Sequence, residues 1–185
     1  MNYRRDSAKK NLSEDDIEFI AANTDFDRNQ ILEWYEEFRQ KCPNNQLNKA
    51  SFVKFYKSLI PGDSKAEDSF CEHVFSAFDT DNNGYIDFSE FLIAFWIRSK
   101  GSLKDKLNWL FDIYDMDKSN YITPWELSRM LRLVFSMKSI NDDPYLASKQ
   151  IFDDIDRSKD GRLTRQEFIA GCTKYEKYRN LFAPF

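Results

Sequence analysis

The sequence predicts an all-α protein of two lobes, each built from a pair of helix–loop–helix units. Two observations favour this class: a twelve-residue loop pattern recurs along the chain, and apolar residues recur at helical spacing on both sides of each loop. At 185 residues with 42% hydrophobic content, the chain is long enough for one large core or two small ones. We therefore expect a globular, mainly helical protein with residues 1–98 and 102–185 as its two lobes.

The three loops, 79–90, 115–126 and 156–167, each place oxygen-bearing side chains at positions 1, 3, 5 and 9 and end in glutamate at position 12. This is the pattern of an EF-hand loop, which surrounds calcium with side-chain oxygens and one backbone carbonyl at position 7. The sequence thus predicts three calcium sites. The expected ligands, with position 9 often acting through water, are Asp79, Asp81, Asn83, the Tyr85 carbonyl, Asp87 and Glu90; Asp115, Asp117, Ser119, the Tyr121 carbonyl, Thr123 and Glu126; and Asp156, Ser158, Asp160, the Arg162 carbonyl, Thr164 and Glu167.

Position 6 of such a loop usually requires a left-handed backbone, which glycine adopts without steric cost. Gly84 and Gly161 meet this need in the first and third loops, whereas the second loop has Asn120, which should lower affinity only modestly. The first loop carries four carboxylates and each of the others three, so we expect loop 79–90 to bind most tightly. A single match could be a solvated acidic turn, but three matches argue against that interpretation.

An earlier stretch, 40–51, follows the same layout but contains no carboxylate and carries Pro43 within it, so it cannot hold calcium. EF-hands work in pairs, and we expect its segment 46–48 to pair with 85–87 in a short two-stranded β ladder. By the same logic, 121–123 should pair with 162–164. The stretch 99–102 reads as a hinge in which glycine ends a helix. Helix starts are predicted by capping boxes at Asp27 with Gln30 and at Ser64 with Glu67.

Composition excludes several other classes of function. The net charge is −4 and no basic face is evident, so nucleic-acid binding is not expected. The single histidine, His73, should be a packed or surface residue, and no catalytic constellation can be assembled around it. Three cysteines, Cys42, Cys71 and Cys172, share no short spacing and should be reduced thiols. No apolar run is long enough for a membrane span, so we expect a soluble, cytoplasmic protein. Because no catalytic arrangement is present, we do not expect an enzyme.

Several residues together resemble the neuronal calcium sensor family of recoverin, frequenin and visinin-like proteins. They are Cys42-Pro43 in the disabled loop, Trp34-Tyr35 ahead of it, and the stretch 106–109 before the second loop. The resemblance covers about residues 12–175. It implies that calcium opens the N-terminal hands and exposes an apolar groove for a helix of a target protein, such as a kinase, a cyclase, an exchange factor or a channel. The residues expected to form this groove are Trp34, Phe38, Phe52, Phe55, Tyr56, Phe88, Phe91, Leu92, Phe95 and Trp109.

The chain departs from that family at its start. Residue 2 is Asn2, so the Met-Gly start needed for N-myristoylation is absent. Four basic residues within 4–10 could attract an anionic membrane surface weakly, although a solvated tail is the favoured interpretation.

The apolar end, 178–185, could either cover the groove or pack on the C-terminal lobe. Magnesium could hold one loop at rest. Two alternatives to a sensor stay open: a calcium buffer, and a constitutive regulatory subunit like calcineurin B or the potassium-channel-interacting proteins.

Overall fold

The computed structural model describes residues 11–42, 44–57 and 65–182, except the side chains of 55–57 and 65–69. Within these residues the chain forms helices joined by short loops and two small β ladders, so the predicted all-α, two-pair EF-hand fold is confirmed. The helices are α1 (Glu14–Asn23), α2 (Arg28–Lys41), α3 (Lys49–Lys57), α4 (Lys65–Phe78), α5 (Phe88–Lys100), α6 (Leu103–Tyr114), α7 (Pro124–Met137), α8 (Pro144–Ile155), α9 (Arg165–Lys174) and α10 (Glu176–Phe182). The strands are β1 (Gln46–Asn48), β2 (Tyr85–Asp87), β3 (Tyr121–Ile122) and β4 (Leu163–Thr164).

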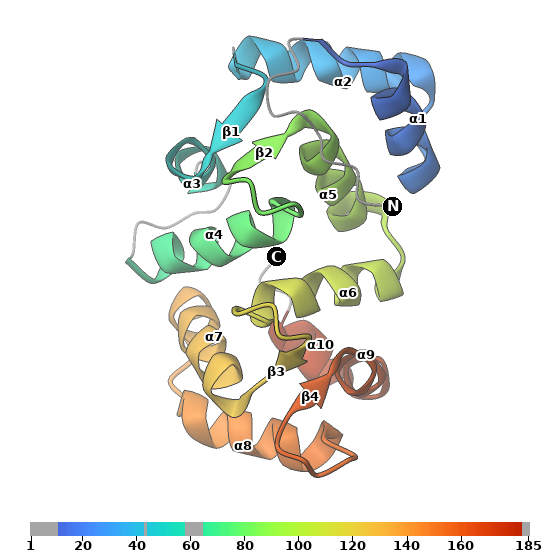
Figure 1. Ribbon diagram of the computed structural model, residues 1–185. Helices are drawn as coiled ribbons and strands as arrows, with labels where there is room; N and C mark the ends of the chain where they lie inside the picture. The colour runs from blue at the N-terminus through green and yellow to red at the C-terminus, as the bar shows by residue number, and fades with distance from the viewer. Residues whose placement is uncertain (1–10, 43, 58–64, 183–185) are drawn as a thin grey trace.

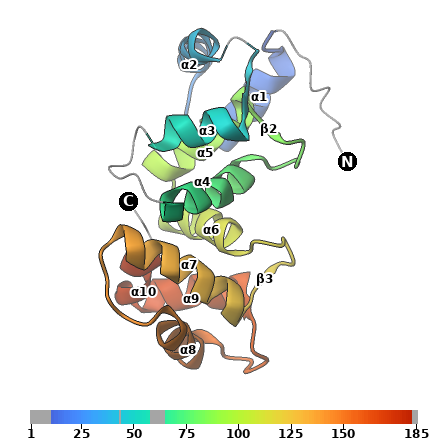
Figure 2. The ribbon, with the colours of Figure 1, turned by 90° about the vertical axis from the view of Figure 1, so that its left-hand side faces the viewer.

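The helices are stacked along one long direction of the molecule. Figure 1 shows α1, α2 and α5 at one end, α4 and α6 across the middle, and α7, α8 and α9 at the other end. Turning the molecule by a quarter shows the same order, with α4 lying between α3 and α6 (Figure 2). The N-terminal half, up to α5, and the C-terminal half, from α6, are therefore in direct contact through α4.

Both predicted β ladders form. Strands β1 and β2 pair antiparallel with Leu47 opposite Ile86, and β3 and β4 pair with Ile122 opposite Leu163. These four aliphatic side chains occupy position 8 of their loops, and all are buried. Each pair of loops is thus joined at its centre, which explains why the disabled loop 40–51 is kept as a structural partner of loop 79–90.

Local signals at the helix ends match the structure where it can be described. The capping box of Asp27 and Gln30 starts α2, and Pro124 occupies the first turn of α7. The predicted box of Ser64 and Glu67 lies outside the described residues. Helix α5 ends at Gly101 as predicted, but Gly101 has φ −56° and is not left-handed. Glycine is needed there because a Cβ atom would lie 2.4 Å from the carbonyl oxygen of Ile97.

The hydrophobic core runs through both halves without interruption. At their boundary, Phe78 from α4 meets Trp109 from α6 edge to face, with ring centroids 5.7 Å apart. Trp109 is buried, with 6% of its surface exposed. The two halves therefore contact each other through apolar side chains as well as through the short link between α5 and α6.

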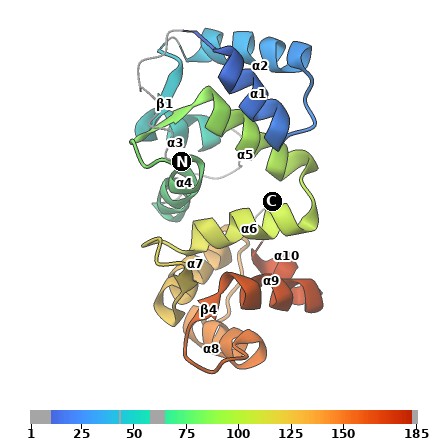
Figure 3. The same ribbon diagram turned by 45° about the vertical axis from the view of Figure 1, so that its right-hand side comes forward.

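The C-terminal helix α10 packs on the C-terminal half. Figure 3 shows α10 beside α9, remote from α2 and β1. Phe182 is fully buried, and its ring lies 5.3 Å from that of Tyr114 and 5.1 Å from that of Phe168. Lys138 at the end of α7 donates hydrogen bonds to the carbonyls of Asn180 and Leu181, the last turn of α10. Up to Phe182, the apolar tail thus fills the C-terminal half and leaves the N-terminal groove alone.

The three cysteines are buried. Burial raises the pKa of the Cys42 thiol and raises that of Cys172 to about 12. Since the thiolate is the reactive form, these two side chains are poor nucleophiles.

Candidate functional site

Each predicted calcium loop joins two helices: 79–90 lies between α4 and α5, 115–126 between α6 and α7, and 156–167 between α8 and α9. The position-9 residues Asp87, Thr123 and Thr164 are the N-caps of the outgoing helices. In each case the position-12 glutamate completes a capping box with that N-cap. One short motif thus starts the helix and presents the glutamate to the loop.

In the first loop, side-chain oxygens are held in place by backbone amides. The Asp79 carboxylate accepts hydrogen bonds from the N–H groups of Asn83 and Gly84, each at 3.0 Å. The Asn83 side-chain oxygen accepts from the Tyr85 N–H at 2.8 Å. Glu90 accepts from the Thr80 N–H at 2.8 Å and from the Asp87 N–H at 3.0 Å. The loop is closed on itself by the oxygens that are predicted to bind calcium.

The second loop repeats this arrangement. Asp115 accepts from the N–H groups of Ser119 and Asn120, each at 2.9 Å. Glu126 accepts from the Met116 N–H at 2.9 Å and from the Thr123 N–H at 2.8 Å. Asn120 has φ +67°, so asparagine does adopt the left-handed conformation that position 6 demands.

In both of these loops three carboxylates converge. Oxygens of Asp79, Asp81 and Glu90 lie within 4.8 Å of one another, as do those of Asp115, Asp117 and Glu126. Burial raises the pKa values of Asp79, Glu90 and Asp115. A neighbouring carboxylate raises each pKa further: Asp81 for Asp79, Asp87 for Glu90, and Glu126 for Asp115. Desolvated carboxylates that face one another are stabilised when a cation neutralises them. This oxygen-only donor set fits a hard divalent cation such as calcium.

The third loop is more open. Glu167 is only partly buried and accepts hydrogen bonds from the N–H groups of Arg157, Ser158 and Thr164, at 3.1, 3.0 and 3.0 Å. Burial alone would raise its pKa, but hydrogen bonds from Thr164 and Ser158 outweigh burial and lower the pKa to about 2. Among the described residues, no three carboxylates gather here as tightly as in the other two loops.

The disabled loop shares one backbone feature with the others, at its position 6. Asn45, at its position 6, has φ +55°. In the three loops with carboxylates, position 4 is left-handed as well, at Asn82, Lys118 and Lys159. Sequence reasoning did not identify position 4, because asparagine and lysine give only a weak signal for this conformation.

An apolar groove of about 610 Å³ lies in the N-terminal half, between α2, α3 and α5. Its walls are aromatic, with Trp34 and Phe95 at 4.8 Å and Phe38 and Phe91 at 5.3 Å between ring centroids. The lining residues are Trp34, Glu37, Phe38, Lys41, Cys42, Leu47, Ser51, Phe52, Lys54, Phe78, Phe91, Phe95 and Arg98.

Five of the ten residues expected in the groove line it: Trp34, Phe38, Phe52, Phe91 and Phe95. Phe88 and Leu92 are buried in the core, where Phe88 packs against Tyr35 and Phe38. The side chains of Phe55 and Tyr56 lie outside the described set. Sequence reasoning did not place Leu47, Phe78 or Cys42 in the groove. The sequence identified Leu47 as position 8 of its loop. Whether its side chain lines a groove depends on how β1 packs against α3, which the sequence does not show.

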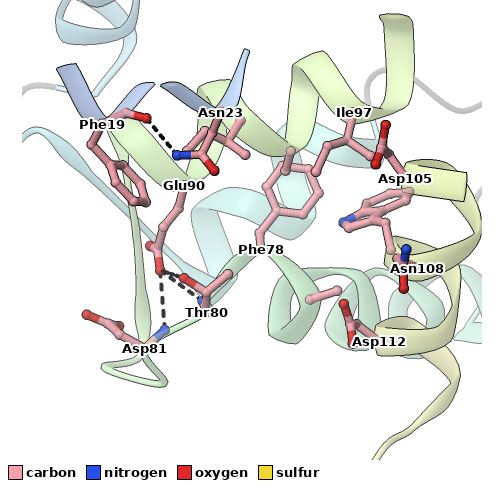
Figure 4. A pocket seen from close by; sticks show the side chains of 14 residues that line it. Phe19, Asn23, Phe78, Thr80, Asp81, Glu90, Ile97, Asp105, Asn108 and Asp112 are labelled. Atoms are coloured by element: carbon pink, nitrogen blue, oxygen red, sulfur yellow. Dashed lines mark hydrogen bonds between the residues drawn. The ribbon is translucent and has the colours of Figure 1, made fainter. Parts of the chain in front are cut away.

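Trp109 lines a different cavity of about 450 Å³, at the contact of α1, α4, α5 and α6. Figure 4 shows Phe19 and Asn23 on one side of this cavity, Asp105, Asn108 and Asp112 on the other, and Glu90 with Thr80 and Asp81 along its wall. The first loop therefore faces the C-terminal half directly.

Comparison with known proteins identifies the class of this fold. Models of the EF-hand domain pair match residues 43–95 and 104–173. The chain is thus an EF-hand protein with two matches to an EF-hand pair, and the first match includes most of the disabled loop.

Two relatives define the family. The chain is 31% identical over 180 residues to S-modulin of Aquarana catesbeiana, covering 92% of this chain and 88% of that protein. It is 34% identical over 151 residues to guanylyl cyclase-activating protein 1 of Lithobates pipiens, covering 80% of this chain and 72% of that protein. The chain belongs to the neuronal calcium sensor family. Members of this family act as regulatory proteins and are not themselves enzymes. In its described part, no helix has both the length and the apolar character needed to cross a membrane.

Proposed function

We propose that this protein is a calcium sensor that holds calcium in loops 79–90, 115–126 and 156–167 and, in that state, accepts a helix of a target protein in the groove of its N-terminal half. The ligands would be the eighteen residues predicted from the sequence. When bound, the ion supplies positive charge that neutralises buried carboxylates.

The observation that carries this proposal is the composition of helix α5. Its first turn holds Glu90, the position-12 residue of the first loop, and the next turns hold Phe91 and Phe95, which line the groove. Because Glu90 belongs to α5, any movement of Glu90 toward a cation would also move α5, which forms one wall of the groove. Sensor EF-hands open in this manner, whereas buffer EF-hands barely move.

We further propose residues 1–98 and 102–185 as the two domains. In support, each EF-hand domain pair match falls within one of these ranges. A guanylyl cyclase is the first target to test, since one relative carries cyclase activation in its name. Magnesium in one loop at resting calcium would add a further level of control, and a calcium titration with and without magnesium would identify that loop.

A fluorescent hydrophobic dye tests the sensor mechanism. Dye fluorescence should rise when calcium is added and return to baseline with chelator, because the aromatic groove walls separate. The Glu90→Gln variant should abolish most of this rise while loops 115–126 and 156–167 still bind calcium. Calcium binding with no dye response in the unmodified protein would instead identify a buffer. Cyclase activity should then be measured with this protein at low and high calcium.

A further inference from the structure

We infer that the groove selects a target helix whose polar residues are mainly acidic. This inference rests on the proposed function of the groove and adds the chemistry of its partner.

The charged rim of the groove carries the evidence. Three basic side chains, Lys41 from α2, Lys54 from α3 and Arg98 from α5, line the groove together with a single acidic one, Glu37. Lys41 and Lys54 are exposed, and Arg98 is half-buried. The basic groups come from three different helices, so they border the groove on more than one side.

The rim is opposite in sign to the protein as a whole. The chain has a formal charge of −4, yet the described rim of the groove is net positive. A local field of this kind attracts partners of negative charge and disfavours basic ones. The ordinary amphipathic helix with a lysine-rich polar face would place like charges against Lys41 and Lys54.

The apolar part of the groove specifies the rest of the partner. Its walls of Trp34, Phe38, Phe91 and Phe95 suit large aliphatic or aromatic anchors spaced three and four residues apart on one helix face. We therefore expect a helix with such anchors, with aspartate or glutamate at its flanks and at most one basic residue, facing Glu37.

Two designed peptides test this inference. Both are amphipathic helices with the same leucine and phenylalanine anchors; one has glutamate on its polar face and the other lysine. At saturating calcium and low salt, the glutamate peptide should bind about 10-fold more tightly, as the two exposed rim lysines, each of modest strength, would give. The preference should shrink as salt is raised, because exposed charges are screened.

Charge reversal at the rim provides the matched variants. Lys41→Glu combined with Lys54→Glu should reverse the preference toward the lysine peptide. Lys104→Glu combined with Lys149→Glu changes the net charge equally at exposed positions outside the groove and should leave the preference intact. Calcium titrations and circular dichroism of both double variants verify that they fold.

Each alternative outcome is distinct. Equal binding of both peptides, or no effect of rim reversal, would overturn the inference and leave the groove as a binding site. Failure of both peptides to bind would overturn the proposed function of the groove. Binding of phosphatidylserine vesicles that depends on Lys41 and Lys54 and that neither peptide displaces would assign the rim to a membrane surface instead, again overturning the inference.

Discussion

Glu90, Glu126 and Glu167 each serve two purposes. Each caps its outgoing helix through the backbone N–H at position 9, and each is the residue proposed to bind calcium with both carboxylate oxygens. These two roles can be separated by mutation, because glutamine also completes a capping box but cannot supply a bidentate anion.

Replacement of any one of these glutamates by glutamine should therefore remove one calcium-binding step and leave the fold in place. Calorimetry should show the number of bound ions fall by one in each single variant. Glu176→Gln on α10 is the control, since its side chain lies outside the loops and should change nothing. Loss of all binding in a single variant would mean that the loops do not act as separate sites.

His73 gives the protein a titratable group at the contact between α4 and α7. Burial lowers its pKa, and the neighbouring charge of Arg129 lowers it further, while Glu72 partly opposes this and Lys49 adds a smaller decrease. The folded protein therefore resists protonation of His73 more than the unfolded chain does.

The direction of the pH effect follows from this difference. The unfolded chain takes up a proton near pH 6.5, where the folded protein does not, so stability from neutral His73 is present above that pH and is lost as the pH falls through it. His73→Gln should remove this part of the acid sensitivity. Unfolding free energies of both proteins at fixed calcium, from neutral to mildly acidic pH, provide the measurement. The single imidazole signal in NMR spectra should titrate below 6.5; a higher value would contradict the expectation.

At the scale of elements, α8 and α9 approach so closely that a glycine is required. A Cβ atom at Gly171 would lie 2.5 Å from Cγ2 and 2.7 Å from Cβ of Ile155, a buried and branched side chain. Gly171 does not have a positive φ, so the reason for glycine here is space rather than backbone conformation.

Gly171→Ala should therefore destabilise the protein despite the better helix propensity of alanine. Overpacking costs about 1–3 kcal/mol, whereas the propensity gain is about 1 kcal/mol. We expect a net loss of about 1 kcal/mol in the free energy of unfolding, measured with denaturant. In an Ile155→Ala background, which provides room, the same change should be neutral or favourable. A stabilising effect in the unmodified background would show that α8 can move away.

At the scale of the whole molecule, the two halves are linked at their calcium loops as well as through the core. Lys118, at position 4 of the second loop, donates hydrogen bonds to the Asp79 carbonyl, at 3.4 Å, and to the Asn82 side chain of the first loop. Asp79 is a predicted ligand of the first loop. Lys118, from the second loop, therefore contacts the backbone of a predicted site in the other half. We therefore expect that ordering of either loop lowers the free-energy cost of ordering its neighbour.

Lys118→Met should weaken cooperativity between the first two loops, by about 2- to 5-fold in the ratio of stepwise calcium constants, as expected for an exposed contact. The experiment belongs in a Glu167→Gln background, where the third loop is silent. Lys159→Met removes an equal charge from position 4 of the third loop, where no cross-half hydrogen bond involves its side chain in the described structure. It should leave cooperativity unchanged. Equal effects of both substitutions would mean that charge alone is responsible.

Much of this molecule could be predicted from local sequence. The twelve-residue loops and the cap of α2 depend on neighbours a few residues apart, and the structure has both. The ladder pairings join distant segments and were predicted because EF-hands work in pairs. Capping, turn conformation and ligand spacing are properties of short segments, so the residues themselves carry that information. The disabled loop could be recognised for the same reason, since a loop without carboxylates cannot form this type of site.

The groove and the contact between the halves could not be derived in this way. Helical spacing identifies an apolar stripe but does not distinguish residues that face the core from residues that line a groove. Phe88 and Phe91 both lie on α5, yet only Phe91 lines the groove. Likewise, nothing local to Trp109, Lys118 or Gly171 reveals the partner that each meets on another helix or loop. Those contacts arise only when distant segments pack. The sequence alone therefore determined the loops and the ligands proposed for calcium, because these lie within short segments, whereas tertiary packing decided which helices and which groove those loops adjoin.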